Sequence, residues 1–332
     1  MTGAGAGAGW GPVRGVVMRT TLLFGTVLAA GLAVSGAVPA SAAQGPDNGR
    51  ITFSRYDPAI DISTLWVADA DGQNQQQLVT GPSTFSDWSP DGTRIAFDYV
   101  DDTGFHIATI TPDGEQRRTL ISEPGVQETP DWSPDGEWIT YGAMDASLPY
   151  FSLSIWVIRA DGTDARRVTS GGFDVEPVFS PDGTQIAFAR IVEDGDEDHP
   201  QVNSLHVVNT DGTGLRQVVA PRAGLEHPDW SPDGKWLGFN IAPERHELAD
   251  SGALLAVRPD GRALHVLRAR TADLGFFKIA WSPDGHRLLM GCFDARLQRD
   301  RLCTSTAGGG NVRPIDLVDD SWVNHPAWGS MP

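Results

Sequence analysis

Residues 87–92 read DWSPDG, and this short phrase decides the fold because it returns along the chain. It recurs as DWSPDG at 131–136, VFSPDG at 178–183, DWSPDG at 229–234 and AWSPDG at 280–285, and a partial copy, HPAW, ends at residue 328. The repeated aromatic residues are separated by 44, 47, 51, 51 and 47 residues. This is the period of a four-stranded propeller blade.

Each repeat predicts four strands, A to D, joined by two tight turns. Proline, aspartate and glycine in SPDG favour a turn after the aromatic that ends strand A. Apolar residues then alternate, as at Ile95 and Phe97, which is typical of strand B. A second phrase, such as LWVADADG ending at Gly72, predicts strand C entering an Asp-Gly hairpin turn before strand D. We interpret the repeated aromatics as core residues between blades and the SPDG aspartates as turn caps.

The two ends of the repeat array complement each other. The last copy stops after Trp328, and the sequence GPDNGRITF near residue 45 begins inside the missing turn, with Pro46 five residues before Ile51. The sequence therefore predicts an all-β, six-bladed propeller of four-stranded blades over residues 44–332. The C-terminal strand joins the N-terminal blade, which removes an open sheet edge.

The N-terminal segment predicts export. Residues 1–43 contain Arg14 and Arg19, no acidic residue, an apolar run from Thr20 to Val38, and an A-x-A pattern at Ala40 and Ala42. This pattern is typical of a secretory signal peptide, with a membrane anchor as the alternative. Translation can start at Met1 or at Met18. We expect a secreted or extracytoplasmic protein with no membrane span after cleavage.

Net charge and cysteine content limit the classes of partner and predict a disulfide. Without the signal peptide, the chain contains 23 basic and 43 acidic residues, a net charge of −20. Such a surface repels nucleic acid, so no nucleic-acid partner is expected. Cys292 and Cys303 lie on neighbouring strands of blade 6, and export favours a disulfide between them, with free buried thiols as the alternative. We expect a monomer.

The double motif, WSPDG followed by a second DG turn, resembles the TolB-type, WD40-like β-propeller repeat. The resemblance covers essentially all of residues 45–332 and implies a six-bladed propeller in a secreted or periplasmic protein. TolB carries a further domain ahead of its propeller, whereas here we expect the repeats to follow the signal peptide directly. Similar repeats occur in prolyl oligopeptidase-like enzymes and oligogalacturonate lyases. The resemblance thus implies a scaffold, and function must be argued from the site.

The candidate site lies where each strand A begins. The B–C and D–A loops vary between blades and share one face, which is where binding residues usually lie. The positions three and four residues before each aromatic predict a ring of side chains at the channel mouth on that face. Its candidate ligand-binding residues are Glu128, Thr129, Glu176, Glu226, His227, Lys278, Asn324 and His325. The alternative is that polar residues there only tolerate water in the channel.

Two classes of function remain open. The chain contains no nucleophile motif and no phosphate-binding loop, so no catalytic residue is assigned. This favours a binding module for an exported protein, a peptide or a cell-envelope component, without a cofactor. The alternative is a metal-assisted polysaccharide lyase or a related enzyme at the channel mouth. We predict no metal site, because Lys278 lies between His227 and His325 in the ring.

Overall fold

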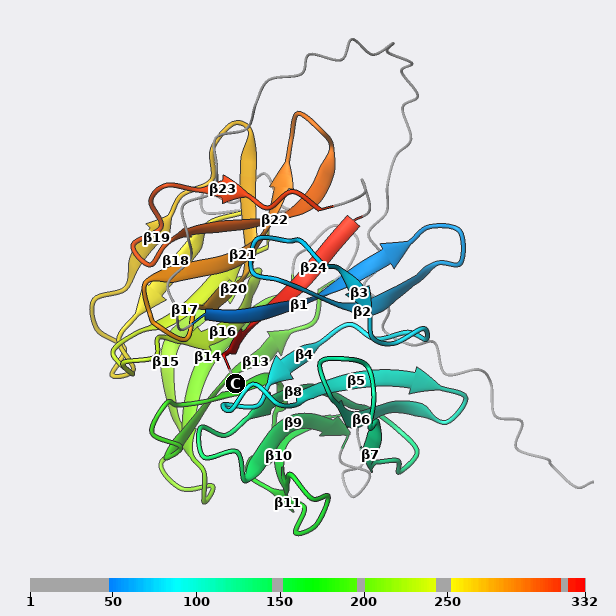
Figure 1. Cartoon of the computed structure of the whole chain (residues 1–332). Coiled ribbons are helices and arrows are strands. Elements are labelled where there is room, and N and C mark those ends of the chain that lie inside the picture. The colour runs from blue at the N-terminus through cyan, green and yellow to red at the C-terminus, as the bar shows by residue number, and fades with distance from the viewer. Residues whose placement is uncertain (1–47, 145–151, 196–200, 243–251, 318–321, 332) are drawn as a thin grey trace, which may run out of the picture. The chain divides into compact units, whose positions relative to one another are not determined.

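The computed structural model describes residues 48–144, 152–195, 201–242, 252–317 and 322–331. These residues belong to one compact unit, residues 42–332. They form six four-stranded antiparallel sheets, so the all-β, six-bladed propeller is confirmed (Figure 1). The signal peptide over residues 1–43 lies outside the described residues and stays a prediction.

The first three blades follow the predicted strand order, and their strands have the following bounds. Blade 1 contains β24 (Trp322–Ser330), β1 (Asn48–Asp57), β2 (Ile62–Ala68) and β3 (Gln76–Gln77). Blade 2 contains β4 (Ser86–Trp88), β5 (Ile95–Asp101), β6 (Gly104–Ile110) and β7 (Arg118–Ile121). Blade 3 contains β8 (Gln127–Trp132), β9 (Trp138–Met144), β10 (Leu153–Arg159) and β11 (Arg166–Arg167).

The other three blades repeat this order. Blade 4 contains β12 (Phe173–Phe179), β13 (Gln185–Glu193), β14 (Val202–Asn209) and β15 (Arg216–Ala223). Blade 5 contains β16 (Leu225–Trp230), β17 (Leu237–Ile241), β18 (Leu254–Val257) and β19 (His265–Arg268). Blade 6 contains β20 (Leu274–Trp281), β21 (Arg287–Asp294), β22 (Arg299–Thr306) and β23 (Arg313–Pro314).

Strand β24 closes the ring as predicted. It pairs antiparallel with β1, and Trp328 lies opposite Ile51. Figure 1 shows the red C-terminal strand beside the blue N-terminal one. The Asn48 side chain also donates a 3.0 Å hydrogen bond to Asp284 in the SPDG turn of blade 6. The N-terminal blade is therefore tied to both its own inner strand and the neighbouring blade.

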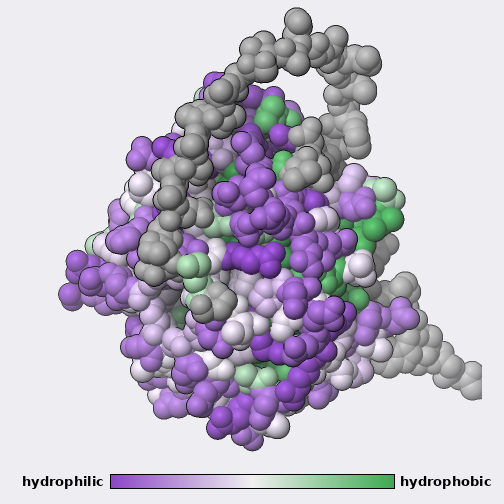
Figure 2. Space-filling view, viewed as in Figure 1, coloured by the Kyte–Doolittle hydropathy of each residue, from purple (hydrophilic) through white to green (hydrophobic). Residues whose placement is uncertain are grey.

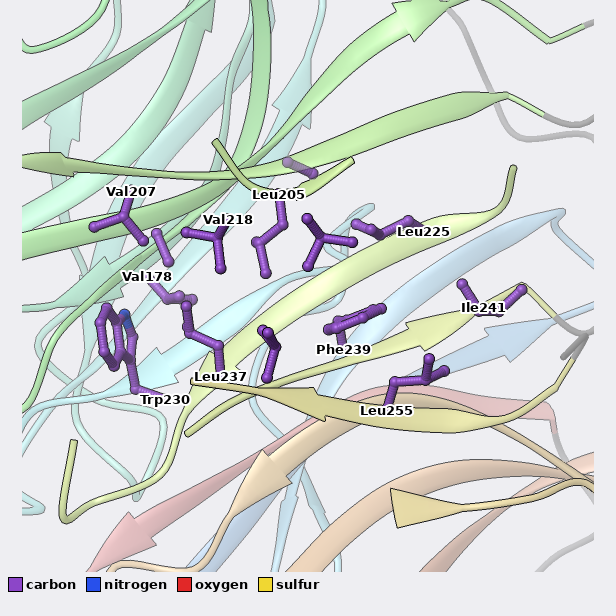
Figure 3. Close-up of a cluster of buried hydrophobic side chains, with 14 of the residues drawn as sticks. Val178, Leu205, Val207, Val218, Leu225, Trp230, Leu237, Phe239, Ile241 and Leu255 are labelled. Atoms are coloured by element: carbon purple, nitrogen blue, oxygen red, sulfur yellow. The ribbon is translucent and has the colours of Figure 1, made fainter. Parts of the chain in front are cut away.

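The core consists of apolar layers between neighbouring blades. Trp230 and Phe239 of blade 5 pack against Val178, Leu205 and other residues of blade 4 (Figure 3). Five of the six repeated aromatics are buried, with Trp88 and Trp328 only 6% and 7% exposed, and the sixth, Trp281, is partly buried against the blade 6 core, which confirms their core role. Outside the core, hydrophilic residues cover most of the surface visible in Figure 2.

The SPDG turns are capped by their own side chains. In blade 2, the Ser89 hydroxyl and the Thr93 N–H donate to Asp91 Oδ1 at 2.6 and 3.0 Å, and the Arg94 N–H donates to Ser89 Oγ. The Ser89 hydrogen bond lowers the pKa of Asp91. Gly92 follows at a φ of 67°, a conformation that glycine adopts at little cost. The same serine-to-aspartate bond occurs in blades 3 to 6.

The two cysteines form the expected disulfide. Cys292 on β21 and Cys303 on β22 are bonded, with a Cα–Cα distance of 6.0 Å, and both are fully buried. They lie diagonally across the hairpin, because Cys303 is paired with Met290 and Cys292 with Arg301. The bond therefore joins the two central strands of blade 6 inside the core.

Candidate functional site

The predicted mouth residues lie at the start of the inner strands. These strands contact one another in ring order, from β24 through β4, β8, β12, β16 and β20 back to β24. They therefore line the axis of the propeller. The B–C and D–A loops lie at the end where the inner strands begin, and we call this end the loop face.

Five of the six inner strands contain a β-bulge at the candidate ring position. In β8, for example, Glu128 and Asp131 pair with Gly142 and Thr140, so one extra residue lies on the inner strand. The bulged residues have left-handed φ values of 43° to 56° although none is glycine: Thr129, Glu176, His227, Lys278 and His325. Such backbone is rare and commonly redirects a side chain near a functional site.

The sequence carries a signal for these bulges. Proline follows the bulged residue in four strands, at Pro130, Pro177, Pro228 and Pro326. Proline cannot donate a ladder hydrogen bond, so inside a sheet it is confined to edges, strand starts and bulges. The repeated X-Pro pair before the aromatic therefore indicates a bulge.

Buried acceptor side chains satisfy the N–H groups that the bulges free. Glu176 Oε2 accepts a 2.6 Å hydrogen bond from the His227 N–H, and Asn240 Oδ1 accepts from the Lys278 N–H at 3.0 Å. Asp98 accepts from the N–H groups of Thr84 and Phe85 ahead of the inner strand of its own blade. Glu176 and Asn240 each hold the bulge of the next blade. Asp98 and Asn240 were not predicted, although both are the fourth residue of strand B.

Three rings from different blades meet across the mouth. The Phe85 and His325 ring centroids lie 4.3 Å apart, those of His325 and His227 lie 5.3 Å apart, and those of Phe85 and His227 lie 6.1 Å apart. Phe85 belongs to blade 2 and His227 to blade 5, which are opposite in a ring of six. We call these three residues the ring cluster, and it bridges the channel at the loop face.

Close contacts between His227 and two carboxyl groups support the ring cluster. His227 Nδ1 lies 2.8 Å from Glu176 Oε1, within ion-pair distance but outside hydrogen-bond geometry, and His227 Nε2 lies 3.9 Å from Glu226. Burial raises the pKa of Glu176, but the nearby His227 ring and the hydrogen bond from the His227 N–H outweigh it and leave that pKa lowered. Burial, followed by the charges of His227 and Lys278, holds the pKa of His325 well below its usual value.

Glu128 has the opposite electrostatic environment. Burial, with the nearby carboxylates of Asp98 and Glu176, raises its pKa to about 7. The mouth thus combines a histidine–glutamate pair with a carboxyl group that readily holds a proton near neutrality. The structure brings Glu176, Glu226, His227 and His325 together, and Lys278 is close enough to act electrostatically on Glu176 and His325.

Three aspartates that were not predicted as site residues line the channel below the mouth. Asp87, Asp131 and Asp229 each precede the repeated aromatic and accept a 2.8 Å hydrogen bond from a backbone N–H of the next blade. Burial raises the pKa of Asp87 to about 6 and that of Asp229 to about 7, while Lys278 lowers both. The recurring Asp-Trp pair in the repeat was the signal for these inter-blade contacts.

Across the described residues, no group of three or more His, Cys, Asp and Glu side chains is placed to hold a metal ion. The metal-assisted enzyme stays an untested alternative. Over the same residues the structure has no helix able to cross a membrane.

Comparisons with known proteins agree with this architecture. The TolB beta propeller domain family matches residues 42–331. An uncharacterized protein of Agrobacterium fabrum is 31% identical over 165 residues, which cover 48% of this chain and 54% of that protein. The Tol-Pal system protein TolB of Bordetella pertussis is 36% identical over 128 residues, 37% of this chain and 28% of that protein. The crystal structure of TolB from Acinetobacter baumannii superposes with a TM-score of 0.68 at 19% identity, covering 84% of this chain and 66% of that one.

Fold and repeat together define a six-bladed propeller with a bulged inner ring. The chain belongs to the TolB beta propeller domain family. It spans about half the length of the Agrobacterium relative and under a third of the Bordetella protein. The likeness to the Acinetobacter structure concerns the fold alone.

Proposed function

We propose that this chain is an extracytoplasmic binding module that recognises an exported protein, a peptide or a cell-envelope component through its loop face. The observation that carries this proposal is the row of left-handed bulges at the mouth. Each such backbone conformation costs roughly 1–3 kcal/mol in a non-glycine residue. In all five bulged inner strands the bulged residue is polar or ionisable, so the cost is borne by polar residues at the start of the inner strands.

The proposed contact residues are those of the mouth: Glu128, Thr129, Glu176, Glu226, His227, Lys278, Asn324 and His325. Acidic, basic and aromatic groups alternate over a short distance there, which suits a polar segment of a partner better than an apolar one. Similarity to a Tol-Pal system protein supports an envelope partner. The Cys292–Cys303 disulfide supports an oxidising, extracytoplasmic compartment.

A capture experiment tests the proposal. Residues 44–332 serve as bait against a detergent extract of the source organism's envelope and its culture medium. One variant bait carries Glu176→Ala, His227→Ala and His325→Ala at the mouth. A matched control carries Glu137→Ala, Lys235→Ala and His286→Ala, which lie on the SPDG turns at the opposite face.

We expect a partner that binds the wild type and the opposite-face control but is lost from the mouth variant. Capture that survives the mouth variant and fails with the control would place binding on the SPDG face and contradict the proposal. Absence of any captured protein would count against a macromolecular partner, and a screen of metals and sugar acids would then test the enzyme alternative.

A further inference from the structure

A separate hollow lies in the loops of blade 6. It has a volume of about 220 Å³ and is bounded by the D–A loop before β20 and the B–C loop after β21. Its lining includes Arg270, Thr271, Leu274, Phe293, Ala295 and Gln298. We call it the blade 6 pocket. The lining combines apolar side chains with polar groups in similar measure, so it offers contacts to both ends of a small amphipathic molecule.

The two loops that form the blade 6 pocket are fastened together. Arg296 on one loop makes a two-point ion pair with Asp273 on the other, at 2.8 and 2.7 Å. The Ala295 N–H also donates to the Asp273 carbonyl at 2.7 Å. These contacts hold the opening in place before any ligand arrives, which lowers the entropy cost of binding.

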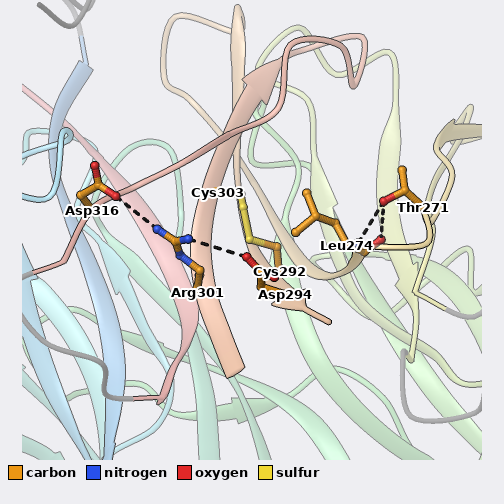
Figure 4. Close-up of a disulfide and its surroundings, with 7 residues drawn as sticks. All are labelled: Thr271, Leu274, Cys292, Asp294, Arg301, Cys303 and Asp316. Atoms are coloured by element: carbon orange, nitrogen blue, oxygen red, sulfur yellow. Dashed lines mark hydrogen bonds and ion pairs between the residues drawn. A yellow bond between two sulfur atoms is a disulfide. The ribbon is translucent and has the colours of Figure 1, made fainter. Parts of the chain in front are cut away.

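The floor of the blade 6 pocket is fixed from below. Leu274 packs against the buried cluster that contains Cys292 and Cys303, and Figure 4 shows it between Thr271 and the disulfide. The Thr271 hydroxyl accepts the Leu274 N–H at 2.9 Å, so it is already engaged in its own turn. Phe293 follows Cys292 directly on β21. Phe293, an apolar residue of the pocket lining, therefore belongs to β21, the strand that the disulfide joins to β22.

One charged group in the lining has no partner. Among the described residues, the Arg270 guanidinium takes part in no hydrogen bond, ion pair or ring contact, whereas Asp273 and Asp294 are paired with Arg296 and Arg301. The Arg270 side chain passes beside Gly252, where a Cβ would stand 3.5 Å from its Cδ. The nearby carboxylates are thus neutralised while the arginine at the pocket is not.

The local charge also favours an anion. The segments around the pocket, residues 268–275 and 293–301, contain five basic and three acidic residues, a net charge of +2, although the whole chain carries −18. A guanidinium binds a carboxylate through two parallel hydrogen bonds. We propose that the blade 6 pocket binds a small organic carboxylate. Its carboxylate pairs with Arg270, and its apolar body lies against Leu274 and Phe293.

Calorimetric titration of the purified protein with sodium benzoate tests this proposal, with benzamide as the neutral molecule of the same shape. We expect benzamide to bind at least tenfold more weakly than benzoate. Arg270→Gln should weaken benzoate binding at least tenfold without lowering the melting temperature, because the side chain is exposed. The matched control is Arg262→Gln, an arginine with an 84% exposed side chain on the DG turn of blade 5, and it should bind like the wild type.

Three results would overturn the proposal: no benzoate binding by the wild type, equal binding of benzoate and benzamide, or wild-type affinity in Arg270→Gln. The mouth variant with Glu176→Ala, His227→Ala and His325→Ala should keep full benzoate affinity. This result would show that the blade 6 pocket binds independently of the mouth, so each of the two proposals can be rejected without rejecting the other.

Discussion

At the scale of single residues, the channel carboxyl groups control how stability responds to pH. The pKa of Asp229 rises from its ordinary 3.8 to about 7, mainly because burial penalises the charged form. A carboxyl group with a raised pKa in the folded state binds its proton more tightly when folded. Its stabilising contribution is complete below pH 3.8 and is lost as pH rises through about 7.

We therefore expect Asp229→Asn to flatten the fall of melting temperature between pH 5 and pH 8. Asparagine does not titrate, and its Oδ1 can still accept the Trp281 N–H. The test is the difference between wild-type and variant melting temperatures across this range. That difference removes the effect of His325, whose lowered pKa acts in the opposite direction. Asp102→Asn, at an exposed turn, is the control, and parallel curves for Asp229→Asn and wild type would contradict the prediction.

The repeat spacing indicated the start of each inner strand as a candidate site but not how the backbone holds the side chains there. The alternation of apolar residues assumes a regular strand, and a bulge changes that alternation without changing composition. The acceptors that satisfy the bulges, such as Glu176 and Asn240, belong to a different blade. Contacts between blades depend on the angle between sheets, and no local pattern encodes that angle.

At the scale of elements, close contact between blades 1 and 2 depends on a glycine. A Cβ at Gly329 on β24 would stand 2.5 Å from Cδ2 of Trp88. We expect Gly329→Ala to force the indole aside and lower the free energy of unfolding by about 1–3 kcal/mol, as overpacked cores do. Urea denaturation measures the change. Gly81→Ala is the control, since a Cβ there meets nothing within 4 Å, and an equal effect of both substitutions would argue against the contact.

The blade 6 hairpin offers a second test at this scale. Cys292 and Cys303 are 11 residues apart and fully buried. Chain entropy predicts that closing a loop of this length stabilises the fold by about 3 kcal/mol. Reductant should therefore shift the urea midpoint of the wild type downward and leave the Cys292→Ala, Cys303→Ala double variant unchanged. The prediction fails if the wild type keeps its midpoint after thiol titration shows that the bond has been reduced.

Strand order and turn positions were predictable because they rest on local chemistry. The Ser-Pro-Asp-Gly hydrogen bonds form within six residues and need no partner from elsewhere in the chain. Outer strands were harder to predict, and in blades 1, 3 and 6 they are only two residues long. Their sequences mix charged and apolar residues, and their exposed edge makes few contacts that would extend the pairing.

At the scale of the whole propeller, the array repeats locally but the ring cluster forms only in the closed ring. The ring cluster shows this, because Phe85, His227 and His325 come from three blades and meet only when all six inner strands are in place. The position of each residue in its own repeat was readable from the sequence. Which of them touch across the axis was not, since that depends on the radius of the closed ring.

Closure of the ring by β24 leads to the last prediction. Deletion of residues 322–332 removes the inner strand of blade 1 and exposes the β1 edge together with apolar residues such as Ile51 and Phe53. We expect a large fall in melting temperature and concentration-dependent association, since an uncovered strand edge pairs with other chains. Trp328→Ala keeps the strand but removes a buried indole, and should cost about 3–5 kcal/mol.

The two variants separate closure from simple loss of apolar contact. Trp328→Ala should stay monomeric in sedimentation experiments, whereas the deletion variant should associate. A synthetic peptide of residues 322–332 should restore the melting temperature of the deletion variant by supplying the missing strand in trans. A deletion variant that melts like the wild type would show that the other strands of the described residues hold the ring without β24, and the mouth built around His325 would then need another explanation.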